Sequence, residues 1–430
     1  MESPDETNFT AKLQQRITYG ETLPNGSILD LVDTGDRDGL SLLFWDGKEP
    51  LIRPVIEYGG VSYRPPNLHP SIRAALRFPR GASKYGATRD LFMKIVNALG
   101  EHLGLPEDYA AFATCWILTS WVLERIVVPP TLCVRGELGQ LCNAMRMFTA
   151  LCRRALLVAE LSRRLPFLLR PTLLVNDPVL SESEVDCAFW RTAGCDGMFV
   201  AGTENTVCSL RCAKAVVLRG DESPAMWGSE AMFVILPHSE LPSLSDQLLA
   251  DIAAEFQPQL EMFRLRLLSG ADPFVSKSHP LSKFELVRNL GACIPEDAEI
   301  VRVLTSLLQL HQEQLLARRS CDPWVASLQA VWTPSHKQKE MAVAEITTRV
   351  NATLRSLDDL YEYNVKEIGW KLRNLKLSTT SNGQRKVLRF SGENRSRIHQ
   401  CFREFGLQLP FFDDCPDCKR LQATEVKPVE

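Results

Sequence analysis

The chain has 430 residues, of which 45% are hydrophobic and 23% are charged, and its formal net charge is −3. At roughly 100–200 residues per domain, this length predicts two to four domains, and the composition is that of a globular protein with a sizeable core. The small net charge excludes a chain that binds nucleic acid over its whole surface, and it leaves room for one local basic region.

The cysteine content and the apolar runs indicate the compartment. Thirteen cysteines, an odd number scattered through apolar stretches, argue against a disulfide framework and for a reducing environment. The acidic, polar segment Met1 to Thr10 is unlike a signal peptide. The most apolar stretch, Tyr109 to Pro130, is interrupted by Glu124 and Arg125, so it predicts a buried helix rather than a membrane span. We therefore expect a cytoplasmic protein with no membrane partner.

The N-terminal region predicts a leader and a small β-rich module. Residues 1–20 are expected to form a disordered leader. Between residues 21 and 66, short apolar runs alternate with the turn dipeptides Asp46-Gly47 and Gly59-Gly60, a pattern typical of β-hairpins. Pro65-Pro66 closes the predicted module.

Residues 67–128 change to a helical pattern. We predict one helix from Thr88 to about Leu99 and a second one from Ala111 to Arg125. The basic run from Arg73 to Arg89 is a candidate for contact with a nucleic-acid backbone, and a solvated linker is the alternative interpretation.

Residues 129–275 alternate short apolar strands with helices. Such strands predict a mainly parallel sheet that is buried on both faces. The expected strands are Thr131–Val134, Ala155–Val158, Thr172–Val175, Cys212–Leu218 and Ala231–Leu236, and the expected helices are Leu138–Cys152 and Leu244–Leu267. Residues 276–334 are predicted to be a helical connector that ends at Pro334.

The first of these strands leads to the place where a phosphate-binding loop would be expected. That motif needs a glycine-rich turn, then Lys and Ser or Thr at a helix start. Aligning Gly136 with its first glycine puts Leu141 at the second glycine, Cys142 at the lysine and Asn143 at the hydroxyl residue. Without the lysine, a transferred phosphoryl group lacks its main protein cation. We therefore expect a protein that is not an ATP-hydrolysing enzyme.

By its order and spacing, the segment nevertheless resembles a P-loop NTPase domain of the AAA+ or helicase type. Its combination with a C-terminal winged helix is similar to bacterial proteins of mobile elements. The resemblance implies a degenerate nucleotide site, with Asn176 at the metal-binding aspartate, Asp177 as a relic acid and Arg219 at the water-sensing position. Asp177 could equally cap a turn before a proline. The implied relic consists of Gly136, Gly139, Asn143, Asn176, Asp177 and Arg219.

Residues 335–408 are predicted to form a winged helix. Two helices, Val343–Leu357 and Val365–Leu375, precede a hairpin with the turn Asn382-Gly383, the order of a helix-turn-helix variant. Lys337 to Leu407 contains 14 Lys or Arg and 8 Asp or Glu, a net charge of +6. The residues expected to contact double-stranded DNA are Lys366, Lys371, Arg373, Lys376, Arg385, Lys386 and Arg389. Use of this unit for protein contact alone is the alternative.

The tail, residues 409–430, contains Cys415 and Cys418 with the spacing of half a zinc site. The nearest further candidates, His399 and Cys401, do not have a standard ligand spacing, and His336 lies in no metal motif. We therefore expect two free thiols, and a zinc ion held through a dimer is the alternative.

Taken together, the sequence predicts a multidomain α/β protein. It would have a three-layer, P-loop-like α/β core, an N-terminal β-rich module and a C-terminal winged helix. We expect a DNA-associated protein with no cofactor and a degenerate core that serves as a scaffold or a surface for homo-oligomers. A weak or partner-activated ATPase, using ATP and Mg²⁺ with Asp177 as the surviving acid, is one alternative. A protein-interaction scaffold without nucleic acid is the other.

Overall fold

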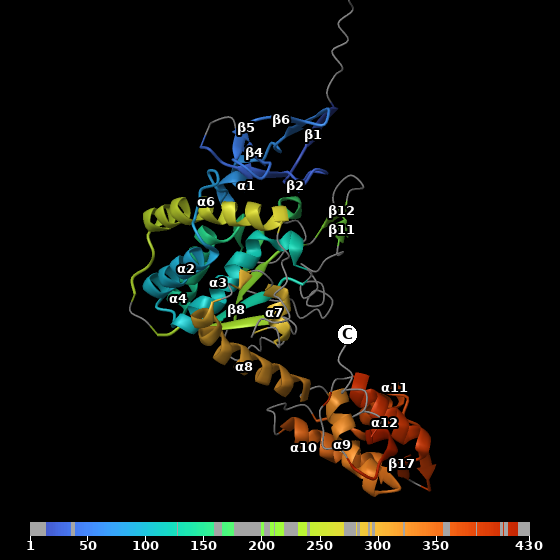
Figure 1. The fold of residues 1–430 in the computed structure, drawn as a ribbon. Helices are drawn as coiled ribbons and strands as arrows, with labels where there is room; N and C mark the ends of the chain where they lie inside the picture. The colour runs from blue at the N-terminus through green and yellow to red at the C-terminus, as the bar shows by residue number, and fades with distance from the viewer. Residues whose placement is uncertain are drawn as a thin grey trace, which may run out of the picture. The chain divides into compact units, whose positions relative to one another are not determined.

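The chain divides into two compact units, Met1–His311 and Gln312–Glu430, each of which is described by itself. The structure is a computed structural model (Figure 1). It describes residues 14–35, 39–126, 128–158, 166–175, 199–201, 207–209, 211–218, 231–238, 241–270, 281, 284–290, 293–294, 297–320, 323–355, 362–383, 385–404, 407 and 412–419.

The first unit begins with two small sheets. β1 pairs in parallel with β7, so part of the predicted leader is a strand. β5 pairs with β4, whereas the next strand, β6, pairs with β7. One sheet has the order β1-β7-β6, and the other has the antiparallel order β2-β3-β4-β5. The bounds are β1 (Gln14–Ile17), β2 (Glu21–Thr22), β3 (Ile28–Val32), β4 (Ser41–Trp45), β5 (Leu51–Arg53), β6 (Ile56–Tyr58) and β7 (Val61–Arg64).

A parallel five-stranded sheet forms the centre of the first unit, as the strand pattern predicts. Its order is β14-β8-β13-β10-β9, and every pairing is parallel. The strands are short and almost wholly buried because both faces pack against apolar side chains. The bounds are β8 (Thr131–Arg135), β9 (Ala155–Val158), β10 (Thr172–Val175), β13 (Lys214–Val217) and β14 (Ala231–Ile235), with a separate hairpin of β11 (Phe199–Ala201) and β12 (Val207–Ser209).

Helices cover one face of this sheet (Figure 1). α3 is apolar on all sides, and every residue from Ala110 to Trp121 is buried, which confirms the predicted buried helix. α2 ends where Gly104 adopts the left-handed conformation. The other face packs against β3 and β4 residues such as Leu29 and Leu42. The bounds are α1 (Pro70–Ala75), α2 (Thr88–Leu103), α3 (Glu107–Trp121), α4 (Leu138–Leu151), α6 (Asp246–Gly270), α7 (Glu285–Leu290) and α8 (Ala298–Ser320), the last of which extends into the second unit.

A buried ion cluster connects the N-terminal sheet to this core. Asp30 of β3 accepts hydrogen bonds from Arg153 at 2.9 Å, from Arg264 at 2.7 Å, and from Arg154. Arg264 also donates to Glu124 at 2.7 Å. Burial by itself would raise the pKa of Asp30, but the three arginine charges outweigh it and hold that pKa well below its usual value.

Glycine is required beside this cluster. Gly20 has a φ of +108°, and a Cβ there would lie 3.2 Å from a carboxylate oxygen of Asp30 and 3.3 Å from Arg154. An L-residue would therefore be strained and would also crowd the ion pair.

The second unit combines helices with a small sheet. α11 begins with a capping box in which Asn364 accepts from the backbone of Lys366 and Glu367. The sheet has the order β15-β17-β16, and Asn382 pairs with Arg385, so the turn lies one residue later than predicted. The bounds are α9 (Pro323–Lys337), β15 (Glu340–Ala342), α10 (Val343–Arg355), α11 (Val365–Asn374), β16 (Thr379–Asn382), β17 (Arg385–Arg389) and α12 (Gly392–Glu404).

Pro334 does not end a helix, in contrast to the sequence-based expectation. It lies inside α9 and is buried with Ala326, Val331 and Trp332. Packing of this apolar face against the core of the second unit outweighs the local tendency of proline to end a helix.

We expect Asp30→Asn to lower the free energy of unfolding by about 3–5 kcal/mol, because it removes the buried carboxylate to which three arginines donate. Urea unfolding followed by tryptophan fluorescence measures this change. Asp46→Asn is the matched control, because Asp46 is an exposed turn residue of the same small sheet. A loss below about 1 kcal/mol for Asp30→Asn would contradict the role given to the cluster.

The stability of the protein should also depend on the protonation of Glu261. Burial, and next the charge of Asp30, raise the pKa of Glu261 from 4.5 to about 8. Between about pH 5 and pH 8 the folded state therefore holds a proton that the unfolded state has lost. The free energy of unfolding should fall with rising pH by up to about 1.4 kcal/mol per pH unit from this group.

Glu261→Gln, which mimics the protonated acid, should remove this part of the slope. Urea unfolding of both proteins across the same pH range measures the difference between their slopes. Groups that titrate identically in the two proteins do not contribute to this difference. Equal slopes would show that Glu261 is ionised in the folded state.

Candidate metal centre and basic surface of the second unit

Two helices direct histidines toward one point in the second unit. His336 is the penultimate residue of α9, and His399 lies on α12 and is 3% exposed. α9 and α12 are in contact, and both bury their apolar faces in the same core. The histidines therefore follow the packing faces of their helices and meet between them.

Two cysteines approach the same point from the C-terminal segment 412–419. A helical turn forms there, in which the Lys419 amide donates to the Cys415 carbonyl at 3.1 Å. Residues three positions apart on such a turn lie on one side, so Cys415 and Cys418 direct their thiols together. Both are buried, at 6% and 1% exposure.

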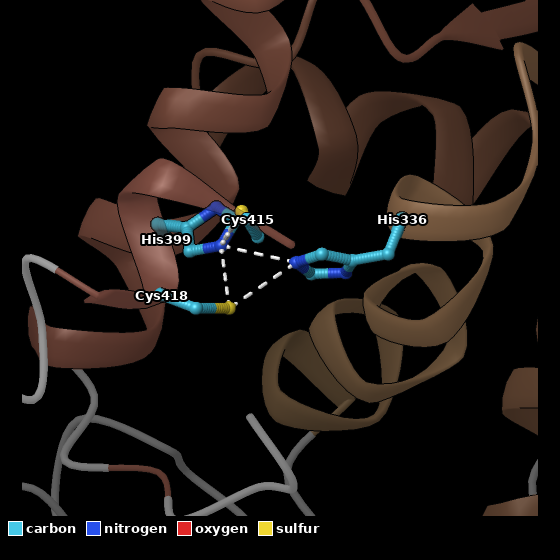
Figure 2. A group of neighbouring side chains, drawn as sticks. All are labelled: His336, His399, Cys415 and Cys418. Carbon is cyan, nitrogen blue, oxygen red and sulfur yellow. Dashed lines mark hydrogen bonds between the residues drawn. The ribbon is translucent and has the colours of Figure 1, made fainter. Parts of the chain in front are cut away.

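The four side chains form a compact group (Figure 2). The Nε2 atoms of His336 and His399 are 3.2 Å apart. Cys418 Sγ lies 3.3 Å from Nε2 of His399 and 3.4 Å from Nε2 of His336, and Cys415 Sγ lies 3.4 Å from Nε2 of His399. All four ligand atoms lie within 4.8 Å of one another.

Backbone carbonyls fix the orientation of both imidazole rings. Nδ1 of His336 lies 2.9 Å from the carbonyl oxygen of Trp332, and Nδ1 of His399 lies 2.8 Å from that of Arg395. A carbonyl only accepts hydrogen bonds, so each Nδ1 carries the proton. In the neutral ring, the Nε2 lone pair then points into the group of four side chains.

Aromatic side chains surround the group. The ring of Phe412 stacks on that of His336 with centroids 4.2 Å apart. The Trp332 ring lies 4.8 Å from both histidine rings. Burial lowers the pKa of His336, and the nearby charges of His399 and Arg395 act in the same direction. The hydrogen bond to the Trp332 carbonyl acts in the opposite direction. A neutral imidazole is the form in which a histidine binds metals.

The structure brings four possible metal ligands together at the place where the sequence predicts two free thiols. The residues present offer two nitrogens and two sulfurs, a donor set that can hold a metal ion. The sequence did not indicate it because His336 and His399 are 63 residues apart and His399 and Cys415 are 16 residues apart. Cys401, the other candidate, directs its thiol to the Leu375 carbonyl instead, at 3.8 Å.

The predicted DNA-contacting residues lie mainly on the surface. Lys366 and Arg373 occupy the exposed side of α11, opposite the buried Ile368 and Leu372. Trp370 lies between them and is 53% exposed. Lys376 follows the helix, and Arg385, Lys386 and Arg389 are exposed on β17.

Two of the predicted cations already have partners. Lys371 is half-buried, and its Nζ lies 4.8 Å from the ring centroid of Trp324 and 5.2 Å from that of Tyr363. Arg389 pairs with Glu340 at 3.3 Å. Within the described part of the chain, no ion pair involves Lys366, Lys376, Arg385 or Lys386.

The loop after β8 is short, and the side chain of Leu236 packs against it. Only Gly136 and Glu137 separate β8 from α4, so Gly139 and Asn143 lie inside the helix. A Cβ on Gly136 would lie 2.8 Å from Cβ of Leu236. This close packing explains why a glycine occupies position 136. The loop leaves no run of backbone N–H groups outside the helix to surround a phosphate.

Asn143 has a structural task in α4. Its side chain donates to the Pro242 carbonyl at 3.2 Å and accepts from the Leu244 amide at 3.1 Å. The remaining residues of the predicted nucleotide-site relic, Asn176, Asp177 and Arg219, lie outside the described residues.

The basic run from Arg73 to Arg89 is largely engaged in internal contacts. Arg73 pairs with Asp33 at 2.6 Å, Arg89 pairs with Asp297 at 2.6 Å, and Arg77 donates to a backbone carbonyl of α6. A cavity of about 680 Å³ beside α1 is lined by Asp33 and Arg73, which already neutralise each other. Neither feature forms a prepared binding site.

Comparison with known proteins does not assign a family. Within the described residues, none of the helices combines the length and the apolarity that crossing a membrane requires. No protein-family model and no curated protein matches the chain. The A form apo structure of the NrS-1 C-terminal region is similar over 84% of this chain and 96% of that chain, at 8% identity and a TM-score of 0.35. Another apo structure of that region has the same identity and TM-score, over 85% and 96% of the two chains.

Proposed function

We propose that the second unit is a winged helix through which the protein binds double-stranded DNA. The order α9, β15, α10, α11, β16, β17 supports this fold, because a helix pair is followed by a hairpin whose strands join β15 in one sheet. In such an arrangement α11 is the helix that enters the major groove, and the β16–β17 hairpin is the wing that lies beside it.

The single observation that carries the proposal is the composition of the exposed side of α11. Lys366, Trp370 and Arg373 follow each other at intervals of four and three residues, so they form one stripe along the helix. Ile368 and Leu372 make the buried core contacts of α11, and of the stripe only Trp370 contacts a residue at the edge of that core, Trp324. A large exposed aromatic side chain between two cations suits contact with base edges between phosphates.

The wing supplies the second set of cations. Arg385 and Lys386 are exposed next to the hairpin turn and have no ion-pair partner among the described residues. Strongly charged side chains at a hairpin tip can reach phosphates without deforming the sheet. Together with α11 they provide about four phosphate contacts, enough for a marked dependence of affinity on salt.

We infer that the first unit is a degenerate P-loop-like core that acts as a scaffold. Its sheet places β8 between β13 and β14. The connection after β8 runs toward one edge, to β9, whereas the connection from β13 runs to β14 at the other edge. In parallel sheets ligands bind at such a switch point. The two-residue loop after β8 is too short for the phosphate cradle, which supports a binding role for the second unit and a scaffold role for the first.

The proposal predicts that charge reversal on α11 and on the wing weakens DNA binding. We expect Lys366→Glu with Arg373→Glu, and separately Arg385→Glu with Lys386→Glu, to lower the affinity of the full chain for a duplex about tenfold or more at low salt. Each pair should also reduce the slope of log K against log salt by about 2, because each lost phosphate contact removes about 0.9. Fluorescence anisotropy across a salt series measures both quantities.

Lys48→Glu with Lys94→Glu is the matched control, because both lysines are exposed in the first unit and the change in charge is the same. A duplex affinity that is absent at low salt, or that neither second-unit pair changes, would overturn the proposal. Such a result would favour the alternative that this surface contacts another protein.

Trp370 should act differently from the cations. Trp370→Ala removes an exposed ring and no charge, so we expect a loss of affinity of about 1–3 kcal/mol with an unchanged salt slope. Circular dichroism of the variant is the check on folding, because Trp370 also contacts Trp324 with ring centroids 5.7 Å apart. Unchanged affinity for every duplex tested would exclude Trp370 from the interface.

A further inference from the structure

We propose that His336, His399, Cys415 and Cys418 bind one Zn²⁺ ion, which fastens the C-terminal segment 412–419 to α9 and α12. This inference is independent of DNA binding. It rests on the separations of the ligand atoms, on the orientation of the histidines and on the charge balance of the group.

The separations agree with a tetrahedral zinc site. With Zn–N bonds of about 2.0–2.1 Å and Zn–S bonds of about 2.3 Å, a regular tetrahedron has edges of about 3.3 Å between nitrogens, 3.5 Å between nitrogen and sulfur and 3.8 Å between sulfurs. The nitrogen–nitrogen separation here is 3.2 Å, and three nitrogen–sulfur separations are 3.3–3.4 Å. Every one of these distances lies close to its tetrahedral value.

Hydrogen bonds within the group cannot account for its closeness. His399 Nε2 has three polar neighbours within 3.4 Å, namely His336 Nε2, Cys415 Sγ and Cys418 Sγ. One imidazole nitrogen has one lone pair and accepts one hydrogen bond well. Two Nε2 lone pairs that face each other also repel unless a cation lies between them. A single central cation satisfies all four atoms at once.

The donor set and the surroundings favour zinc. Two thiolates balance the charge of Zn²⁺, so the occupied centre would be neutral, as a buried site requires. A tetrahedral set of two nitrogens and two sulfurs suits zinc, whereas magnesium and calcium prefer oxygen ligands. Both histidines already donate from Nδ1 to backbone carbonyls, which is the outer contact that usually orients zinc-bound imidazoles.

Three of the four ligands are buried and His336 is half-buried, which indicates a structural role. All four positions are occupied by protein ligands, so none is left for water or substrate. Trp332 and Phe412 pack against the histidine rings, and Phe402 packs against Trp332. Because the ligands come from α9, α12 and the tail, the binding free energy of the metal would contribute to the folding of the second unit.

Metal content of the full chain tests the proposal. We expect protein purified under reducing conditions without chelator to contain about one zinc ion per chain, measured by inductively coupled plasma mass spectrometry, and to lose it in Cys415→Ser and in Cys418→Ser. Cys401→Ser is the matched control, because Cys401 is a buried thiol of the same unit that faces the Leu375 carbonyl. Wild-type protein without bound zinc after dialysis against zinc, or full zinc content in both tail variants, would overturn the proposal.

Cobalt substitution tests the proposed metal site even if the variants fail to fold. Wild-type protein loaded with Co²⁺ should show the strong visible bands of a tetrahedral ion and a thiolate-to-cobalt charge-transfer band, which Cys401→Ser should leave unchanged. A weak octahedral spectrum would contradict a centre with two histidines and two cysteines. So would a metal-free chain in which mass spectrometry finds Cys415 and Cys418 joined by a disulfide.

Discussion

The burial of one carboxylate constrains the whole first unit. Asp30 lies on the face of β3 that turns toward the helices. Three arginines neutralise it, and they lie 123, 124 and 234 positions after Asp30 in the sequence. A buried carboxylate without these partners would be too costly to ionise. The N-terminal strands therefore share one core with the parallel sheet and its helices. Gly20 and the left-handed backbone of Arg154, with a φ of 47°, follow from the same crowded site.

One helix of the second unit, α9, contacts both the surface proposed for DNA and the proposed metal centre. Trp324 at the start of α9 contacts Trp370 and Lys371 of α11, whereas His336 near its end faces the proposed metal centre. At 1.5 Å per residue these ends are about 18 Å apart. A metal ion at one end of α9 would hold the helix against α12 and the tail. The surface proposed for DNA would then rest on a helix whose position is fixed.

In the first unit, the residues around the end of β8 have packing roles. Its sheet has the switch point at which a ligand would bind, and its first strand leads directly into a helix. Yet Gly136 serves the packing of Leu236, and Asn143 holds the segment around Pro242 and Leu244. Function follows the residues of a site rather than the architecture around it. Among the described residues of the second unit, Lys366, Lys376, Arg385 and Lys386 have no ion-pair partner.

The sequence by itself determined the local elements. Apolar runs between turn residues located the five central strands, the uninterrupted apolar stretch located α3, and the helical pattern from Val365 to Leu375 located α11. Each of these signals lies within a few neighbouring residues. Only the tertiary structure decided the rest. Pro334 lies inside α9 because the core of the second unit packs around it, and two histidines 63 residues apart meet two cysteines because α9 and α12 are in contact. Side-chain convergence over such separations depends on packing, which no local pattern encodes.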